Sequence, residues 1–182
     1  YYLKAQVLYG LSAGLAGFFI ASRIHYRFYQ KFALVFLLLS VGLPILLYTP
    51  LGVELKGATR QVEIGPISFQ PSELLKLVFL LYLAAWLSRA PDRQESFARG
   101  FLPFLLVCGA ISGLLIFQRS TSAVIILMGT ALVAYFASGA RLRYIGIAIL
   151  LGIAAMLVIS YQTPYRWERI VNFLNPQANP EG

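Results

Sequence analysis

Residues 57–76 read GATRQVEIGPISFQPSELLK and interrupt a chain that is otherwise mostly apolar. This stretch is polar, and Gly57, Gly65, Pro66 and Pro71 punctuate it. Glycine and proline at such close intervals are typical of loops and helix starts rather than helix interiors. The stretch therefore predicts a polar insert between two hydrophobic segments.

The composition of the flanking sequence indicates an integral membrane protein. Of the 182 residues, 59% are hydrophobic and 12% are charged, whereas soluble domains average roughly 45–50% and 25%. The mean hydropathy is +0.73. A soluble helical protein needs helices with one charged, solvated face, and the long charge-free runs leave no such face.

Six apolar runs have about the length that a helix needs to cross a bilayer. The predicted spans are residues 5–22, 32–53, 72–88, 101–118, 120–140 and 144–163. Residues 54–71 form a predicted loop and residues 164–182 a polar tail. We therefore predict an all-α fold, a polytopic bundle of transmembrane helices.

The net charge of +8 does not indicate nucleic-acid binding, because the basic residues are scattered at the ends of the apolar runs. The loops after the first, third and fifth spans hold Arg23, Arg27, Lys31, Arg89, Arg93, Arg99, Arg141 and Arg143. The opposite side holds Lys4, Lys56, Arg60, Arg119, Arg166 and Arg169. This bias favours a cytoplasmic location for the first set. The insert, the turn at 118–122 and the tail then face the outside.

Glu73 and Lys76 are ionisable residues at the start of a predicted span, and their spacing places them on one helix face. Ionisable residues in a span indicate function by default, because their desolvation must be compensated. The alternative is that Glu73 complements the helix dipole and Lys76 extends to the interface. Arg60 and Arg119 have two interpretations as well: contact with a phosphate or carboxylate, or exposure in a loop.

No metal site is predicted. Cys108 and His25 are the only residues of their types, and neither has nearby ligands at metal-binding spacing. Cys108 lies in an apolar run, and His25 lies in a basic loop at the predicted interface.

Three motifs resemble the signatures of one known family. They are GATR at Gly57–Arg60, GPISFQPSELLKL at Gly65–Leu77 and RIVNFLNPQANPEG at Arg169–Gly182. In this order, and on one predicted side of the membrane, they are similar to the motifs of the SEDS family, the RodA, FtsW and SpoVE-like proteins. The resemblance covers essentially the whole chain. It implies spans two to seven of a ten-span protein, so that the first and the last three spans fall outside this sequence.

The resemblance implies a multi-pass peptidoglycan glycosyltransferase of the bacterial cytoplasmic (inner) membrane, acting in cell elongation or division. Its implied substrate is lipid II, a disaccharide-pentapeptide on an undecaprenyl pyrophosphate carrier, and its implied partner is a class B penicillin-binding protein. The predicted substrate-binding residues are Arg60, Glu73, Lys76 and Arg119, since an outward-facing site with Arg and Lys can hold a pyrophosphate. No cofactor is predicted, and a divalent cation is left open.

The chain departs from the family pattern at the catalytic position. The family's last motif carries an aspartate regarded as catalytic, and the matching residue here is Asn179. A neutral amide cannot act as a carboxylate base. Glu181, two positions further on, is a candidate for a displaced substitute. Arg119 stands roughly where the family has another aspartate, and Gln61 stands where a tryptophan is usual.

Two other functions stay open. A lipid-linked precursor flippase requires charged residues that line a route near the membrane midplane, whereas the spans are nearly free of charge apart from Lys76. A catalytically degenerate scaffold that recruits a penicillin-binding protein is favoured by Asn179.

Overall fold

The computed structural model describes residues 10–49, 52–55, 58–64, 67–118 and 120–161. Arg119, Asn179 and Glu181 lie outside the described residues. The chain divides into two compact units, Tyr1–Gly139 and Ala140–Gly182, and each is described by itself.

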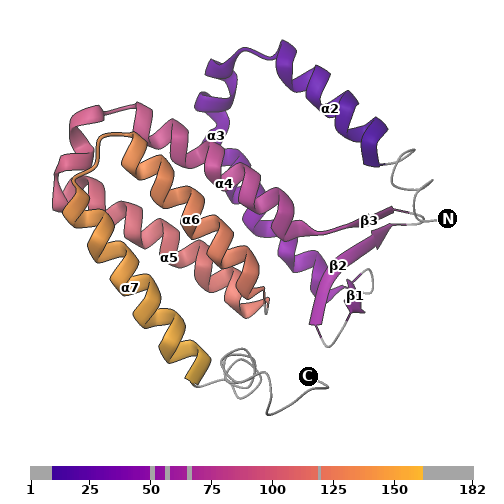
Figure 1. Cartoon of the computed structure of the whole chain (residues 1–182). Helices are drawn as coiled ribbons and strands as arrows, with labels where there is room; N and C mark the ends of the chain where they lie inside the picture. Colours follow the sequence, from indigo (N-terminus) through magenta and orange to yellow (C-terminus); the bar gives the residue numbers. More distant parts are fainter. Residues whose placement is uncertain (1–9, 50–51, 56–57, 65–66, 119, 162–182) are drawn as a thin grey trace. The chain divides into compact units, whose positions relative to one another are not determined.

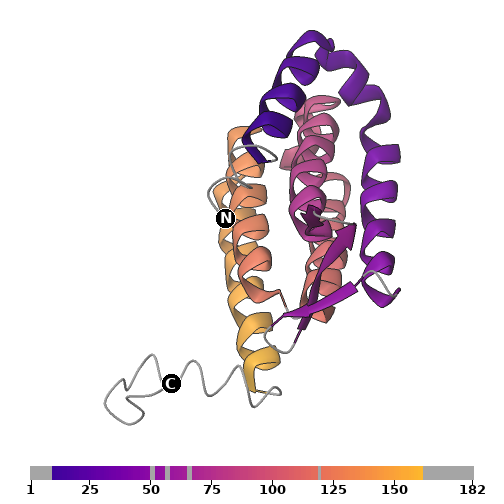
Figure 2. The same ribbon diagram turned by 90° about the vertical axis from the view of Figure 1, so that its right-hand side faces the viewer.

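The first unit is a helical bundle with a small antiparallel sheet at one end (Figures 1 and 2). Its α-helices are α2 (Ser12–Arg23), α3 (Tyr26–Gly42), α4 (Pro71–Ser88), α5 (Leu102–Phe117) and α6 (Thr121–Ala137). Shorter helical segments are η2 (Leu43–Tyr48), η3 (Pro91–Glu95) and η4 (Phe97–Phe101), and the strands are β1 (Gly52–Leu55), β2 (Ala58–Ile64) and β3 (Ile67–Phe69). The second unit contains helix α7 (Leu142–Tyr161). The predominance of helix confirms the predicted all-α class.

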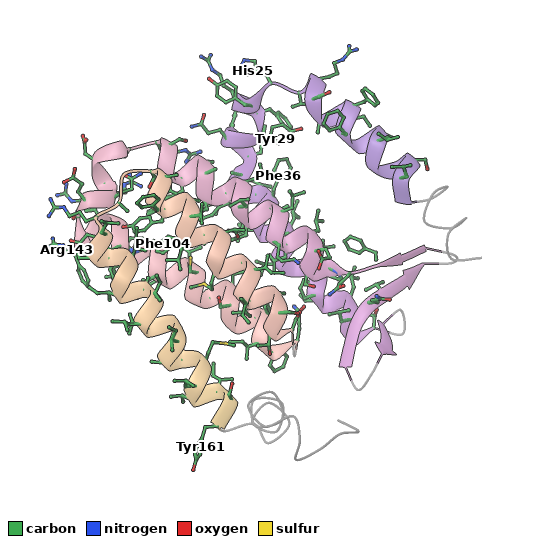
Figure 3. All side chains as sticks on the ribbon, viewed as in Figure 1. His25, Tyr29, Phe36, Phe104, Arg143 and Tyr161 are labelled. Carbon is green, nitrogen blue, oxygen red and sulfur yellow. The ribbon has the colours of Figure 1, made fainter. Side chains whose placement is uncertain are left out.

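Helix α4 is the centre of the first unit, because it packs against α3 and also against α6, which in turn packs against α5. Leu75, Phe79 and Leu83 of α4 are at most 1% exposed and recur at the four-residue spacing of one helix face. On α5 and α6, Phe104 stacks on Tyr135 with ring centroids 4.2 Å apart and an interplanar angle of 11° (Figure 3). These contacts form the core.

The outer surfaces of the helices are strongly apolar. Leu38, Leu39 and Ile45 are each more than 60% exposed, as are Ile125 and Val133. Within the described residues, four helical stretches are long and apolar enough to cross a membrane: Tyr26–Leu47, Pro71–Ser88, Phe97–Phe117 and Leu142–Tyr161. Thr121–Ala137 is a shorter apolar helix. Exposed apolar side chains of this kind are more stable in contact with lipid than with water.

The segment predicted as a loop at 54–71 contains the sheet, which the sequence analysis did not anticipate. Strand order is β1-β2-β3, and both pairs are antiparallel. Residues 52 and 53, which the apolar pattern assigned to a span, lie in β1, since the helix before them ends at Tyr48. Pro44 opens the tighter η2 segment, because proline lacks the N–H that continues an α-helix.

The segment between α4 and α5 is folded rather than extended. Its centre is Gln94, which is only 2% exposed. Gln94 Nε2 donates a hydrogen bond to the carbonyl oxygen of Leu87 at 2.7 Å, near the end of α4. The hydroxyl of Tyr135 on α6 donates to the backbone oxygen of Gln94 at 3.2 Å. Gln94 therefore connects the ends of α4 and α6.

His25 ends the turn between α2 and α3 as the N-cap residue of α3 (Figure 3). Its Nδ1 accepts a hydrogen bond from the backbone N–H of Arg27 at 3.3 Å. This role satisfies one of the unpaired donors at a helix start.

Gly100 allows a direct test of how tightly the segment between α4 and α5 is packed. A Cβ at Gly100 would fall on the backbone carbonyl oxygen of Arg93 and 2.9 Å from the Cα of Gln94. Because backbone atoms cannot swing aside, Gly100→Ala should lower the free energy of unfolding by about 1–3 kcal/mol. Thermal melting of the purified protein in detergent would measure the loss.

Gly113→Ala is the matched control, since nothing lies within 4 Å of a Cβ at that helical position. Alanine there should leave stability unchanged or raise it by about 0.5–1 kcal/mol. Equal melting temperatures for the two variants would contradict the tight packing of Gly100 on the Arg93–Gln94 backbone.

Candidate functional site

The first two turns of α4 hold the two ionisable residues that the sequence singled out. Lys76 Nζ lies 2.8 Å from Glu73 Oε1, and the pair is an i,i+3 salt bridge. The Lys76 side chain is 19% exposed and that of Glu73 is 59% exposed. The lysine stem is thus mostly covered, while its ammonium group meets the carboxylate at the edge of the bundle.

The local sequence explains why α4 begins where it does. Pro71 occupies the first turn, where its missing N–H costs nothing, and Gln70 is the extended N-cap residue. Gln70 Nε2 donates to the hydroxyl oxygen of Ser72 at 2.9 Å. Glu73 is the acidic residue of the first turn, where the helix dipole favours a negative charge. The carboxylate is therefore held in place both by the helix and by Lys76.

Arg60 lies on β2, which contacts α4. The register of β1 and β2 shifts between Val53 and Glu54: Val53 pairs with Gln61, but Glu54 pairs with Thr59. Arg60 is the extra residue that this shift leaves without a partner in β1. Such β-bulges bend the strand locally and occur preferentially beside functional sites.

The sheet and α4 are continuous in sequence and in space. Val62 pairs with Phe69 of β3, and only Gln70 separates β3 from α4. The structure therefore brings the strand of Arg60 to the same end of the bundle as Glu73 and Lys76. The predicted contributions of Arg119, Asn179 and Glu181 fall outside the described residues.

Gln118 is a further polar residue at this end that the sequence analysis did not select as a site. Ser88 at the end of α4 and Ser138 just after α6 line the same cavity. The two helices therefore run in the same direction, and α6 begins near the start of α4. Gln118, just before α6, is 7% exposed, and its Nε2 has no hydrogen-bond acceptor among the described residues. A lone amide at the end of an apolar run was its only signal in the sequence.

Among the described side chains, this site presents one ammonium group, that of Lys76, which is paired with the Glu73 carboxylate. Within the ranges that the structure describes, no three His, Cys, Asp or Glu side chains come together to hold a metal ion. Lys76 supplies a positive charge, Glu73 orients it, and the sheet supplies a rigid neighbouring backbone.

Comparison with known proteins assigns this chain to a family. The family model FTSW_RODA_SPOVE, described as "Cell cycle protein", matches residues 1–182. The probable peptidoglycan glycosyltransferase FtsW of Nitrosococcus halophilus is 39% identical over 182 residues, which cover 99% of this chain and 46% of that protein. The chain thus spans about half the length of the curated relatives it matches.

Solved structures agree with the sequence match. A chain described under "Structural coordination of polymerization and crosslinking by a peptidoglycan synthase complex" has a TM-score of 0.72 and 26% identity, with 94% of this chain and 50% of that chain covered. The rod shape determining protein RodA of Thermus thermophilus has a TM-score of 0.66 and 26% identity, with 82% and 48% covered.

The sequence motifs, the apolar helices and the whole-length match agree on one conclusion. This chain is a multi-pass membrane protein that belongs to the FtsW, RodA and SpoVE family of cell cycle proteins.

Proposed function

We propose that this chain forms part of a peptidoglycan glycosyltransferase that polymerises lipid II at the outer face of the bacterial cytoplasmic membrane. The observation that carries the proposal is the Glu73–Lys76 pair, with 2.8 Å between its charged atoms, at the end of the bundle that also holds the strand of Arg60. The relatives named as probable peptidoglycan glycosyltransferases support the activity.

Polymerisation of a lipid-linked sugar makes two chemical demands. The attacking sugar hydroxyl must lose a proton to a base, and the departing pyrophosphate needs positive charge. Lys76 suits the second demand, because an ammonium is a compact charge that binds phosphate. Exposed Leu77, Leu80 and Leu81 of α4 offer apolar surface close by for a lipid tail.

The energetics of the Glu73–Lys76 pair favour a role in binding over one in folding. A pair at i,i+3 on a helix contributes only about 0.2–0.5 kcal/mol to stability. So small a gain in folding stability does not by itself explain why most of the Lys76 side chain is shielded from solvent. The pair is better explained as a preorganised contact for an anionic substrate.

A class B penicillin-binding protein is the partner that we propose. The similar chain of solved structure comes from a peptidoglycan synthase complex described as coordinating polymerization and crosslinking. Polymerised glycan strands are what a crosslinking enzyme consumes, so a direct complex of the two activities is chemically sensible.

A second function, a scaffold that recruits this partner without catalysis, is favoured by one observation. The resemblance implies that the aspartate regarded as catalytic in the family is matched by Asn179 in this chain. A neutral amide cannot take the proton from the attacking hydroxyl. The two functions differ in what happens when a carboxylate is restored at this position.

Restoring the carboxylate should raise polymerisation. With purified lipid II and the penicillin-binding partner, the Asn179→Asp protein should form glycan polymer at least about 10²-fold faster than the wild-type protein. This is the size of effect that general-base catalysis typically has on a rate. Gel analysis of the labelled glycan products measures the rate. If neither protein forms polymer while both still bind the partner, the scaffold function replaces the enzyme.

Removing the cation should abolish most of that activity. In the Asn179→Asp protein, Lys76→Met should slow polymerisation by about 10²-fold, the typical effect of losing one electrostatic contact to the developing charge. The melting temperature should stay nearly constant, because the salt bridge stabilises the helix so little.

Lys31→Met is the control for this change. Lys31 lies on α3 and is exposed, with its Nζ 5.5 Å from the Phe32 ring centroid. It carries the same charge away from the proposed site, so its loss should leave the rate unaltered. Full activity of the Lys76→Met protein would remove Lys76 from the substrate site.

A further inference from the structure

The carboxylate of Glu73 is accessible to a substrate, in contrast to the mostly covered Lys76 beside it. The Glu73 side chain is 59% exposed, and its Oε1 lies 2.8 Å from Lys76 Nζ. Within the described residues, the ammonium engages this oxygen alone. The second carboxylate oxygen is therefore available to a hydrogen-bond donor that a substrate brings.

The other described acidic side chains of the first unit lie at the opposite end of α4. They are Asp92 and Glu95, both exposed, in the segment that follows the helix. Glu73 and Ser88 are fifteen residues apart on α4, which is about 22 Å along the helix axis. Among the acidic side chains that the structure describes, only Glu73 is therefore within reach of a substrate held by Lys76.

The start of α4 holds Glu73 in position. Its backbone N–H donates to the carbonyl oxygen of Gln70 at 3.1 Å, and its side chain accepts from Lys76. A lysine ammonium has three donors, and one of them is used on Glu73. The others can donate to a phosphate at the same time. A phosphate and the carboxylate would then share one cation.

A phosphate bound at Lys76 changes the chemistry of the neighbouring carboxylate. Two negative charges in one site disfavour each other, so a bound pyrophosphate favours protonation of Glu73. Before the substrate binds, the ammonium and the helix start favour the charged carboxylate. Glu73 is therefore ionised when the site is empty and accepts a proton more readily once the substrate has bound.

We propose that Glu73 is the catalytic base of this chain, an assignment that rests on the proposed glycosyltransferase function. The oxygen of the attacking sugar hydroxyl bonds to the anomeric carbon of a second lipid-linked sugar, and the bond from that carbon to the phosphate oxygen breaks. The electron pair of the broken bond leaves with the pyrophosphate, whose charge Lys76 compensates. The hydroxyl proton passes to Glu73 and then to water. Glu73 thus supplies the proton acceptor that the amide of Asn179 is not.

Glu73→Gln tests this assignment in two backgrounds of the full-length protein. Glutamine keeps an oxygen that accepts from Lys76, but it cannot take up a proton. In the wild-type background, Glu73→Gln should slow polymerisation of lipid II by about 10²-fold, the typical effect of losing a general base. In the Asn179→Asp background, the restored carboxylate takes the proton. The same change should then slow polymerisation by no more than about threefold, the effect of a slightly weaker hydrogen bond to Lys76.

The comparison of the two backgrounds separates a base from a residue that only orients Lys76. An orienting residue would lower both rates by the same factor, because Lys76 faces the same pyrophosphate in both proteins. Unequal factors are the coupling that a double-mutant cycle measures. Equal factors would overturn the proposal. Glu73→Asp keeps a carboxylate, and in the wild-type background it should polymerise faster than Glu73→Gln.

Glu95→Gln is the matched control, since it makes the same substitution at an exposed position beyond the far end of α4. It should leave the rate unchanged in both backgrounds. Melting temperatures of the Glu73 variants should stay close to those of their parents, because an i,i+3 ion pair contributes so little to stability. A slower rate without a lower melting temperature then reports on chemistry rather than on folding.

Failure of this assignment and failure of the proposed function give different results. Polymer from the Asn179→Asp protein, with none from the wild type, would remove Glu73 as the base and leave the glycosyltransferase function standing. Wild-type polymerisation that Glu73→Gln does not slow would have the same meaning. No polymer from either parent protein would overturn both proposals.

Discussion

The first unit depends on the pair of hydrogen bonds that Gln94 makes between two helices. Its amide donates to a carbonyl near the end of α4, and its backbone oxygen accepts from Tyr135 of α6. In an apolar surrounding, each of these groups would be costly if left unpaired. Since Gln94 is almost wholly buried, the segment between α4 and α5 is part of the core rather than a surface loop. The parallel course of α4 and α6 is fixed at this end.

Helix α4 connects the two ends of the first unit. Its first turns carry the Glu73–Lys76 pair, and its last turns line the cavity with Ser88 and Leu87. A continuous helix is stiff, so its two ends belong to one rigid element.

The small sheet gives the end of the bundle at which α4 begins a defined backbone. Helices satisfy their own hydrogen bonds, whereas an insert between two spans must find partners elsewhere. Antiparallel pairing among β1, β2 and β3 provides them, and the bulge that isolates Arg60 departs from that pairing at a single residue. Strand β3 then leads through Gln70 into α4. The family's motif residues thus lie on an element that is rigid for local reasons.

Much of this architecture follows from the sequence alone. The length of the charge-free runs determines that they form membrane-spanning helices, because only a helix satisfies its backbone within one apolar segment. The motif order was sufficient to assign the family, and the i,i+3 spacing placed Glu73 and Lys76 on one face. The alternation of Val62, Ile64, Ile67 and Phe69 around Gly65 and Pro66 was also a signal for a hairpin. The polar composition of the insert obscures this signal.

The tertiary structure alone decided three features: the unpaired position of Arg60 in β2, the burial of Gln94 and the cavity between α4 and α6. Each depends on which segment lies beside another, and not on the properties of one segment. Gln94 belongs to a polar, charged stretch whose composition favours exposure, yet it is buried, and its backbone oxygen accepts a hydrogen bond from Tyr135 on a helix about forty residues further along. Local sequence patterns report periodicity and length, whereas register and packing between distant segments are set by the energy of the assembled fold.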